Sequence, residues 1–160
     1  MPSMLSAFYV AIVLVLGSSA QGAEVALVTE RDMYAESASV TVDQFHAALK
    51  SGDAKAALAL LGDKIVIYEE GDSELTRAQY AACHLQADID FTSGVAETVV
   101  RRDAGASVDL AWVLTQGRML GTYRGRVVDR RTTETMVLRR VSDGWKIVHI
   151  HWSSKASPPS

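Results

Sequence analysis

The last strand-like stretch of the chain constrains its fold more than any other feature. Residues 144–154 read Gly-Trp-Lys-Ile-Val-His-Ile-His-Trp-Ser-Ser, and an Asp143-Gly144 turn signal precedes them. Side chains of a strand alternate between its two faces. One face is therefore expected to carry Trp145, Ile147, His149, His151 and Ser153. The other is expected to carry Lys146, Val148, Ile150 and Trp152. Both faces hold apolar bulk, so we predict a central strand in a sheet covered on both sides.

The rest of the chain after Gly94 also reads as strands. The strand-like segments are 95–102, 107–119, 123–129, 133–141 and 145–154. The expected separators are Ala104-Gly105, the region from Gly117 to Gly121, Arg130-Arg131 and Ser142-Asp143-Gly144. Strands of this length joined by short turns are typical of an antiparallel meander.

The first half of the chain favours helices. Thr41 is a fair N-cap for a helix over 42–50, and Asp53 for a helix over 54–61. A β-branched strand over 65–68 follows, and Thr76 begins a third helix that runs to about Asp88. Helices followed by a curved sheet predict an α+β domain with the helices on one side.

The N-terminus predicts export. Residues 5–16 form an apolar run that is too short to span a bilayer, and small residues follow up to Ala20. We expect a signal peptide over 1–20, with Ala23 as a second possible cleavage point and a retained N-terminal anchor as the alternative. The mature protein is then periplasmic or extracellular, without stable membrane insertion. Residues 21–39 are interpreted as a linker or loosely ordered segment, 40–154 as the single domain and 155–160 as a tail.

Composition excludes several function classes. The formal charge is −3 and the pI is near 5.8, and no basic stripe is present to neutralise phosphates, so we expect no nucleic-acid partner. The chain has no glycine-rich phosphate loop and no His-Glu-x-x-His or Gly-x-Ser-x-Gly motif, and no cofactor is expected. The lone Cys83 cannot form an internal disulfide.

Several motifs together resemble a known family. They are Leu114-Thr115-Gln116, Glu134-Thr135, Arg139-Arg140, Gly144-Trp145 and Val148-His149-Ile150-His151 followed by Ser153. Over roughly residues 40–154 the chain resembles the NTF2-like superfamily, in particular its SnoaL-like and DUF4440 group, and the association (hub) domain of calcium/calmodulin-dependent kinase II. The resemblance implies an NTF2-like, cystatin-like cone, in which three N-terminal helices close a strongly curved antiparallel sheet around one pocket. It also implies a homodimer that forms through the sheet.

The chain departs from the hub domain at its pocket. Three arginine positions of the hub pocket correspond to Val113, Met136 and Trp152 here, and its pocket histidine corresponds to Thr92. The resemblance therefore does not support a carboxylate ligand held by arginines. It implies a more apolar pocket.

The correspondence with the hub pocket also predicts which side chains line the cone. If Val113, Met136 and Trp152 face its interior, alternation also places Thr115, Glu134, Leu138, Val148 and Ile150 there. A buried Glu134 needs a partner, and Arg118 or Arg124 on a neighbouring strand is expected to supply it. The principal functional hypothesis is that the pocket binds a small, mostly apolar molecule. The expected ligand-binding residues are Tyr68, Glu70, Tyr80, His84, Asp88, Glu134, Met136 and Trp152.

Two alternatives stay open. In the first, a hydrogen bond between His84 and Asp88 makes one of them the general base of an isomerase or hydratase, although such a pair is also ordinary on a helix surface. In the second, His149 and His151 face outward from the sheet, in a subunit interface or as two ligands of Zn²⁺ or Cu²⁺ that would need further ligands.

Overall fold

The computed structural model describes residues 28–158, and the predicted signal peptide over 1–20 lies outside them. In chain order the elements are α1 (Glu30–Ser51), α2 (Ala54–Leu60), β1 (Leu61–Glu69), β2 (Asp72–Glu74), α3 (Arg77–Cys83), α4 (Leu85–Gly94), β3 (Val95–Ala106), β4 (Leu110–Tyr123), β5 (Arg126–Val141) and β6 (Gly144–Ala156). Within residues 28–158, no helix has both the length and the apolar character that crossing a membrane requires.

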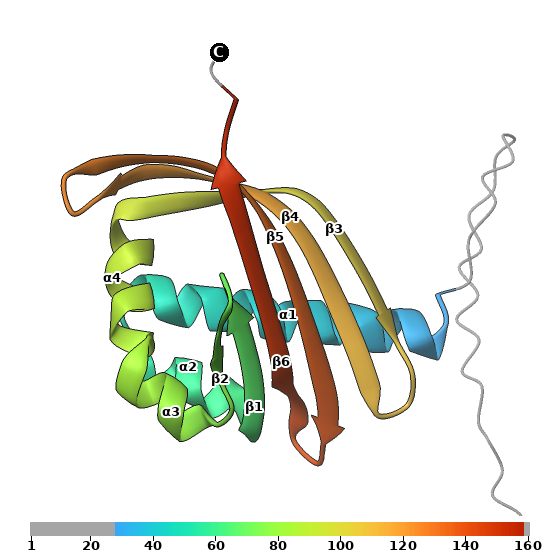
Figure 1. Cartoon of the computed structure of the whole chain (residues 1–160). Helices are drawn as coiled ribbons and strands as arrows, with labels where there is room; N and C mark the ends of the chain where they lie inside the picture. The colour runs from blue at the N-terminus through green and yellow to red at the C-terminus, as the bar shows by residue number, and fades with distance from the viewer. Residues whose placement is uncertain (1–27, 159–160) are drawn as a thin grey trace, which may run out of the picture.

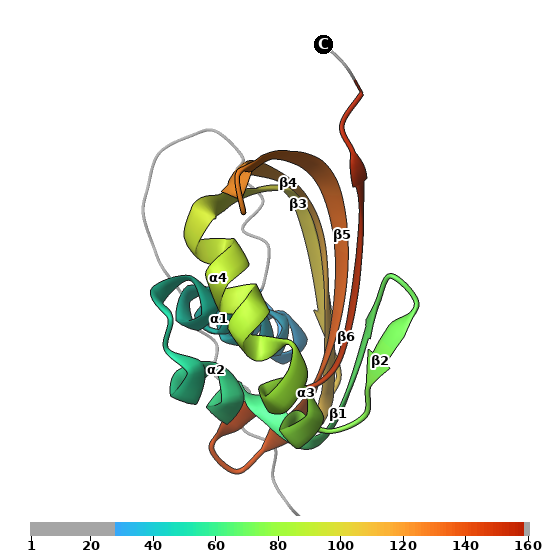
Figure 2. The same cartoon turned by 60° about the vertical axis from the view of Figure 1, so that its left-hand side comes forward.

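The six strands form one bent sheet in the order β2-β1-β6-β5-β4-β3. Strands β3 to β6 make the antiparallel meander that the sequence predicts, and β1 joins its free edge parallel to β6. All four helices lie on the concave side of the sheet, and α1 crosses that side (Figures 1 and 2). The predicted α+β class with N-terminal helices on a curved antiparallel sheet is confirmed.

Strand β6 is central, as predicted, but it carries an irregularity that alternation alone misses. Val137 of β5 pairs with His149, and the next residue, Leu138, pairs with Ile147, so Val148 is an extra residue on β6. Such a bulge shifts the alternation by one position. Ile147 and Ile150 are therefore both fully buried. The prediction that Trp145 and Ile147 share the outer face with the two histidines is wrong.

Helix α1 begins twelve residues before the position that the sequence predicts. Thr29 is the N-cap: its hydroxyl accepts from the Asp32 amide, and the Asp32 carboxylate accepts from the Thr29 amide. Thr41, the predicted cap, lies inside the helix, where its hydroxyl donates to the Ser37 carbonyl. Residues 30–39 of the predicted linker over 21–39 are therefore helical. The buried stripe extends back to Ala38, and Tyr34 continues it against Trp145.

Other helix and strand boundaries also differ from those that the sequence predicts. The predicted third helix is two helices, because the backbone changes direction at His84, although Thr76 caps α3 as expected. The predicted separators at Ala104-Gly105, Gly117–Gly121 and Arg130-Arg131 do not interrupt strands. Strands β3, β4 and β5 run through them in that order, and β4 and β5 turn at Arg124-Gly125. Strand β6 continues to Ala156, two residues into the predicted tail.

The core fills the concave side of the sheet beneath α1. Its largest fully buried members come from α1, α3 and four strands. They are Phe45, Val42, Tyr80, Leu61, Ile65, Ile67, Val113, Met136, Leu138, Ile147 and Ile150. This core occupies one end of the cone and leaves a cavity at the other.

Candidate functional site

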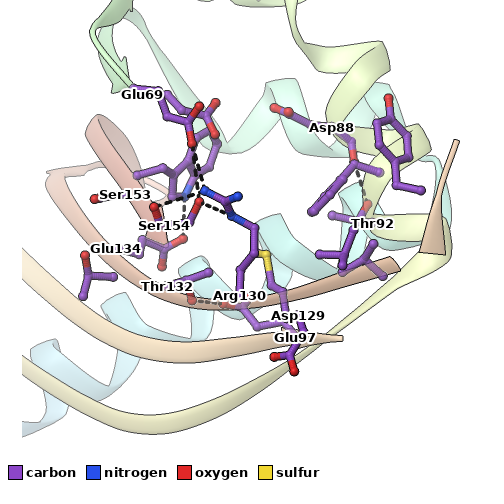
Figure 3. Close-up of a pocket in the computed structure, with 18 of the residues that line it drawn as sticks. Glu69, Asp88, Thr92, Glu97, Asp129, Arg130, Thr132, Glu134, Ser153 and Ser154 are labelled. Atoms are coloured by element: carbon purple, nitrogen blue, oxygen red, sulfur yellow. Dashed lines mark hydrogen bonds and ion pairs between the residues drawn. The ribbon is translucent and has the colours of Figure 1, made fainter. Parts of the chain in front are cut away.

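A cavity of about 530 Å³ opens between α1, α4 and the concave face of the sheet. Its apolar lining includes Leu49, Phe91, Val95, Met119, Tyr123, Val128 and Trp152. Its ionisable lining consists of His46, Glu69, Glu70, Asp88, Glu97, Arg126, Asp129, Arg130 and Glu134. Glu69 and Asp88 approach it from opposite sides (Figure 3). The site is a concave cavity that combines apolar walls with converging polar groups, as small-molecule pockets do.

The predicted alternation of the inner face is confirmed apart from Val148. Val113, Met136, Leu138 and Ile150 are fully buried, and Thr115 and Glu134 are buried polar residues. Trp152 and Glu134 also line the cavity. Val148, at the bulge, lies instead beside Gly62 of β1.

Glu134 occupies the middle of the inner face, and its partners are not the predicted arginines. Its Oε2 lies 2.9 Å from His46 Nε2 and accepts from Trp152 Nε1 at 2.8 Å. Arg118 is paired with Asp129 instead. Among residues 28–158, Glu134 Oε1 is the one buried side-chain polar atom that has no hydrogen-bond partner.

In the His46–Glu134 pair, the protonated form of His46 and the ionised form of Glu134 are favoured. Burial disfavours the charged form of each residue, but the ionic contact between them outweighs it. The contact raises the pKa of His46 above its ordinary 6.5 and lowers the pKa of Glu134 below its ordinary 4.5. A buried imidazolium–carboxylate pair at the cavity wall therefore links α1 to β5.

Asp88 on α4 presents a carboxylate to the cavity. Its Oδ2 accepts from the Tyr80 hydroxyl at 2.7 Å, and Tyr80 itself is fully buried. Burial raises the pKa of Asp88, and the Tyr80 hydrogen bond and nearby His84 offset part of that effect. Burial and the same carboxylate raise the pKa of Tyr80. Asp88 is thus a partly desolvated base that a neighbouring hydroxyl holds in place.

The predicted hydrogen bond between His84 and Asp88 is not formed. His84 Nδ1 contacts the buried carboxylate of Glu74 in β2, a short strand that the sequence did not reveal. His84 is not among the residues that line the cavity. The backbone between the two residues is helical, since the Asp88 amide donates to the His84 carbonyl. The side chains nevertheless have other partners, Glu74 for His84 and Tyr80 for Asp88.

The other predicted ligand-binding residues divide between the cavity and its surroundings. Glu70 lines the cavity, where Arg130 Nη2 donates to it at 3.4 Å. Arg130 Nε donates to Ser154 Oγ at 2.8 Å (Figure 3). Tyr80 and Met136 support the site from the core without lining it. Tyr68 lies on the outer face, where its ring contacts His149 edge-on.

His149 and His151 face away from the cavity, as predicted. His149 Nδ1 lies 2.9 Å from the Val66 carbonyl, and His151 is exposed. No cluster of three or more histidine, cysteine, aspartate or glutamate side chains in the described range could hold a metal ion. Within that range, the alternative zinc or copper site does not have the further ligands it needs.

Several cavity residues escaped the sequence-based prediction. His46 was not among the predicted ligand-binding residues, and Arg130 was expected in a separator between strands. A continuous β5 puts Arg130 and Thr132 on the same face as Glu134 by simple alternation. That signal was available in the sequence. The partnership of His46 with Glu134, which are far apart in the chain, was not.

Comparisons with known proteins agree with this architecture. A family model described as a SnoaL-like domain matches residues 39–157. The chain belongs to the SnoaL-like family. The resemblance inferred from its strand motifs is thereby confirmed, and no curated protein matches this SnoaL-like chain.

Solved structures similar to this SnoaL-like protein include an enzyme candidate and assembly domains. A putative ketosteroid isomerase from Shewanella frigidimarina is 36% identical, with a TM-score of 0.70 over 73% of this chain and 94% of that one. A putative dehydratase of the NTF2-like family from Streptomyces avermitilis is 17% identical, with a TM-score of 0.69 over 79% and 99%. The association domain of C. elegans CaMKII is also 17% identical, with a TM-score of 0.61 over 74% and 93%. The last two likenesses show the fold alone.

The buried pair predicts a stability that depends on pH. The lowered pKa of Glu134 contributes stability above pH 4.5 that is lost as the pH falls, and the raised pKa of His46 contributes stability below pH 6.5 that is lost as the pH rises. Glu134→Gln should therefore cost most, about 2 kcal/mol in free energy of unfolding, between these two values. Urea unfolding across the pH range measures this cost. The exposed control Glu36→Gln should change stability by less than about 0.5 kcal/mol throughout, and a cost of Glu134→Gln that does not vary with pH would contradict the charged pair.

Proposed function

We propose that the protein binds a small, mostly apolar molecule in the cavity of its cone. The observation that carries this proposal is the cavity itself: about 530 Å³ bounded by Phe91, Val95, Met119, Val128 and Trp152. A fully packed interior would leave no such volume, because protein cores close to nearly crystalline density. Trp152, at one of the positions of the hub arginines, also supports it, since it gives the cavity an aromatic wall in place of a cation.

A cavity-filling variant tests the proposal. Val128→Trp should reduce the affinity for a neutral apolar probe, N-phenyl-1-naphthylamine, by at least about tenfold, because the indole occupies volume that the probe needs. The matched control is Val100→Trp, at an exposed position outside the cavity lining. Fluorescence titration measures both. Equal probe affinity in the two variants, or no binding to the wild-type protein, would refute the proposal.

A second candidate function is proton transfer, with Asp88 as the general base. Asp88 lines the cavity, and burial raises its pKa, as a base that works near neutrality requires. The 36% identical neighbour is described as a putative ketosteroid isomerase. In this hypothesis Asp88 takes a proton from the carbon next to a carbonyl group of the bound molecule and returns it to another carbon. His84, which contacts Glu74 outside the cavity lining, is not the base.

Exchange of deuterium for hydrogen beside the carbonyl of a small aromatic ketone, followed by NMR, tests the second candidate. Asp88→Asn should lower the exchange rate by about 10²-fold or more, because the amide cannot accept the proton. His84→Ala is the control and should retain the rate within a few-fold. The wild-type rate should rise with pH through a midpoint above 3.8, because burial raises the pKa of Asp88. A larger loss in His84→Ala than in Asp88→Asn would reverse the assignment.

The outer face of the sheet favours a homodimer. Trp112, Leu114 and Leu120 of β4 are each more than 40% exposed there. Leu114 pairs with Thr135, Thr135 with His151, and His151 with Tyr68, so one cross-strand row spans the face. We propose that two copies pair through this surface, with His149 and His151 in the interface. The similar association and hub domains of CaMKII are named for assembly.

The dimer proposal predicts a change of mass. Leu114→Glu should shift the protein to monomer in light scattering, because the new carboxylate would be buried without a partner in the interface. Leu75→Glu makes the same substitution at an exposed site outside the sheet face and should leave the mass unchanged. A wild-type protein that is monomeric at every concentration would exclude the dimer.

A further inference from the structure

Of the two ring nitrogens of His46, one is paired with a carboxylate and the other has no partner among residues 28–158. Its Nε2 is paired with Glu134 at 2.9 Å, and its side chain keeps 25% of its surface exposed. Nδ1 makes no hydrogen bond with any residue from 28 to 158, yet it is not sealed in the interior, since Glu134 Oε1 is the sole buried polar side-chain atom without a partner in that range. His46 lines the cavity, so a molecule bound there can contact its ring.

The charged side chains of the cavity lining determine which kind of ligand group His46 Nδ1 can bind. Six carboxylates line the cavity, those of Glu69, Glu70, Asp88, Glu97, Asp129 and Glu134, against three cationic groups, the guanidinium groups of Arg126 and Arg130 and the imidazolium of His46. The excess negative charge disfavours an anionic ligand. An uncharged oxygen that accepts a hydrogen bond meets no such repulsion.

We infer that His46 is a specificity-determining residue of the cavity, whose Nδ1–H donates a hydrogen bond to an uncharged acceptor oxygen, such as a carbonyl, on an otherwise apolar ligand. This inference rests on the proposed ligand-binding function and specifies its ligand class. Glu134 is a positioning residue: its Oε2 fixes the orientation of the ring through Nε2 and favours the imidazolium, in which both nitrogens carry a proton.

Three molecules that share an apolar body provide the test. 2-Acetylnaphthalene carries a carbonyl, 2-isopropenylnaphthalene has the same shape with CH₂ in place of the oxygen, and 2-naphthoate carries a carboxylate. The wild-type protein should bind the ketone at least about tenfold more tightly than the hydrocarbon, since a hydrogen bond from a charged donor is worth that ratio. It should bind 2-naphthoate more weakly than the ketone. Isothermal titration at about pH 6, where imidazole is protonated, measures all three.

Two variants and a control isolate the nitrogen. His46→Phe combined with Glu134→Gln removes the donor without leaving a buried charge unpaired, and the ketone should lose its advantage over the hydrocarbon. Glu134→Gln alone keeps the imidazole, so it offers a folded protein even if the double variant does not fold. Thr98→Val removes an exposed hydroxyl outside the cavity lining and should leave the ketone preference unchanged.

The carbonyl stretching frequency of the bound ketone supplies a readout that a purely structural role would not move. The hydrogen bond should lower this infrared frequency in the wild-type protein, less so in Glu134→Gln and not in the double variant. Equal affinity for ketone and hydrocarbon, tightest binding of 2-naphthoate, or an unshifted carbonyl would overturn the inference while leaving ligand binding intact. Failure of all three molecules to bind would count against the proposed function as well.

Discussion

A single extra residue in β6 sets the geometry on which the rest of the structure depends. Alternation would place Ile147 and Ile150 on opposite faces, but the bulge at Val148 turns both inward. The strand before the bulge then supplies the core with Trp145 and Ile147. The strand after it supplies Ile150 to the core and Trp152 to the cavity. One strand thereby forms the floor of the core and the wall of the cavity, and its two histidines are left on the outside.

The boundary between core and cavity is polar. Glu134 lies on the inner face between buried Met136 and the lining residue Thr132, where an unpaired carboxylate would be costly. His46 and Trp152 satisfy one of its oxygens, and the other has no partner within the described residues. Buried ion pairs contribute little net stability compared with apolar packing. Their retention at a cavity wall is better explained by what the charged ring can offer to a ligand.

Much of the fold followed from local patterns, and the errors have identifiable causes. The inner-face residues of β4 and β5 were predicted from alternation, because period-two burial holds wherever a strand is regular. The start of α1 was missed because Thr41 has cap chemistry, while the actual cap at Thr29 lies in a polar stretch without a clear period. His84 and Asp88 were placed together because they are four residues apart, but the His84 ring contacts Glu74 of β2, and the sequence did not reveal that strand. A strand boundary was expected at Arg130-Arg131, where two charged residues lie within a partly exposed strand.

By itself, the sequence determined the class of the fold, the family, the central place of the last strand and the apolar character at Val113, Met136 and Trp152. These follow from residue type and from periods that operate over a few neighbouring residues. The tertiary structure alone decided that Glu134 is paired with His46 rather than an arginine, that Asp88 lines the cavity without His84, and that Tyr68 lies outside it. Those outcomes depend on strand register, on one bulge and on the path of α1 across the sheet. Such features bring together residues that are far apart in the chain, and no local pattern encodes which of them meet.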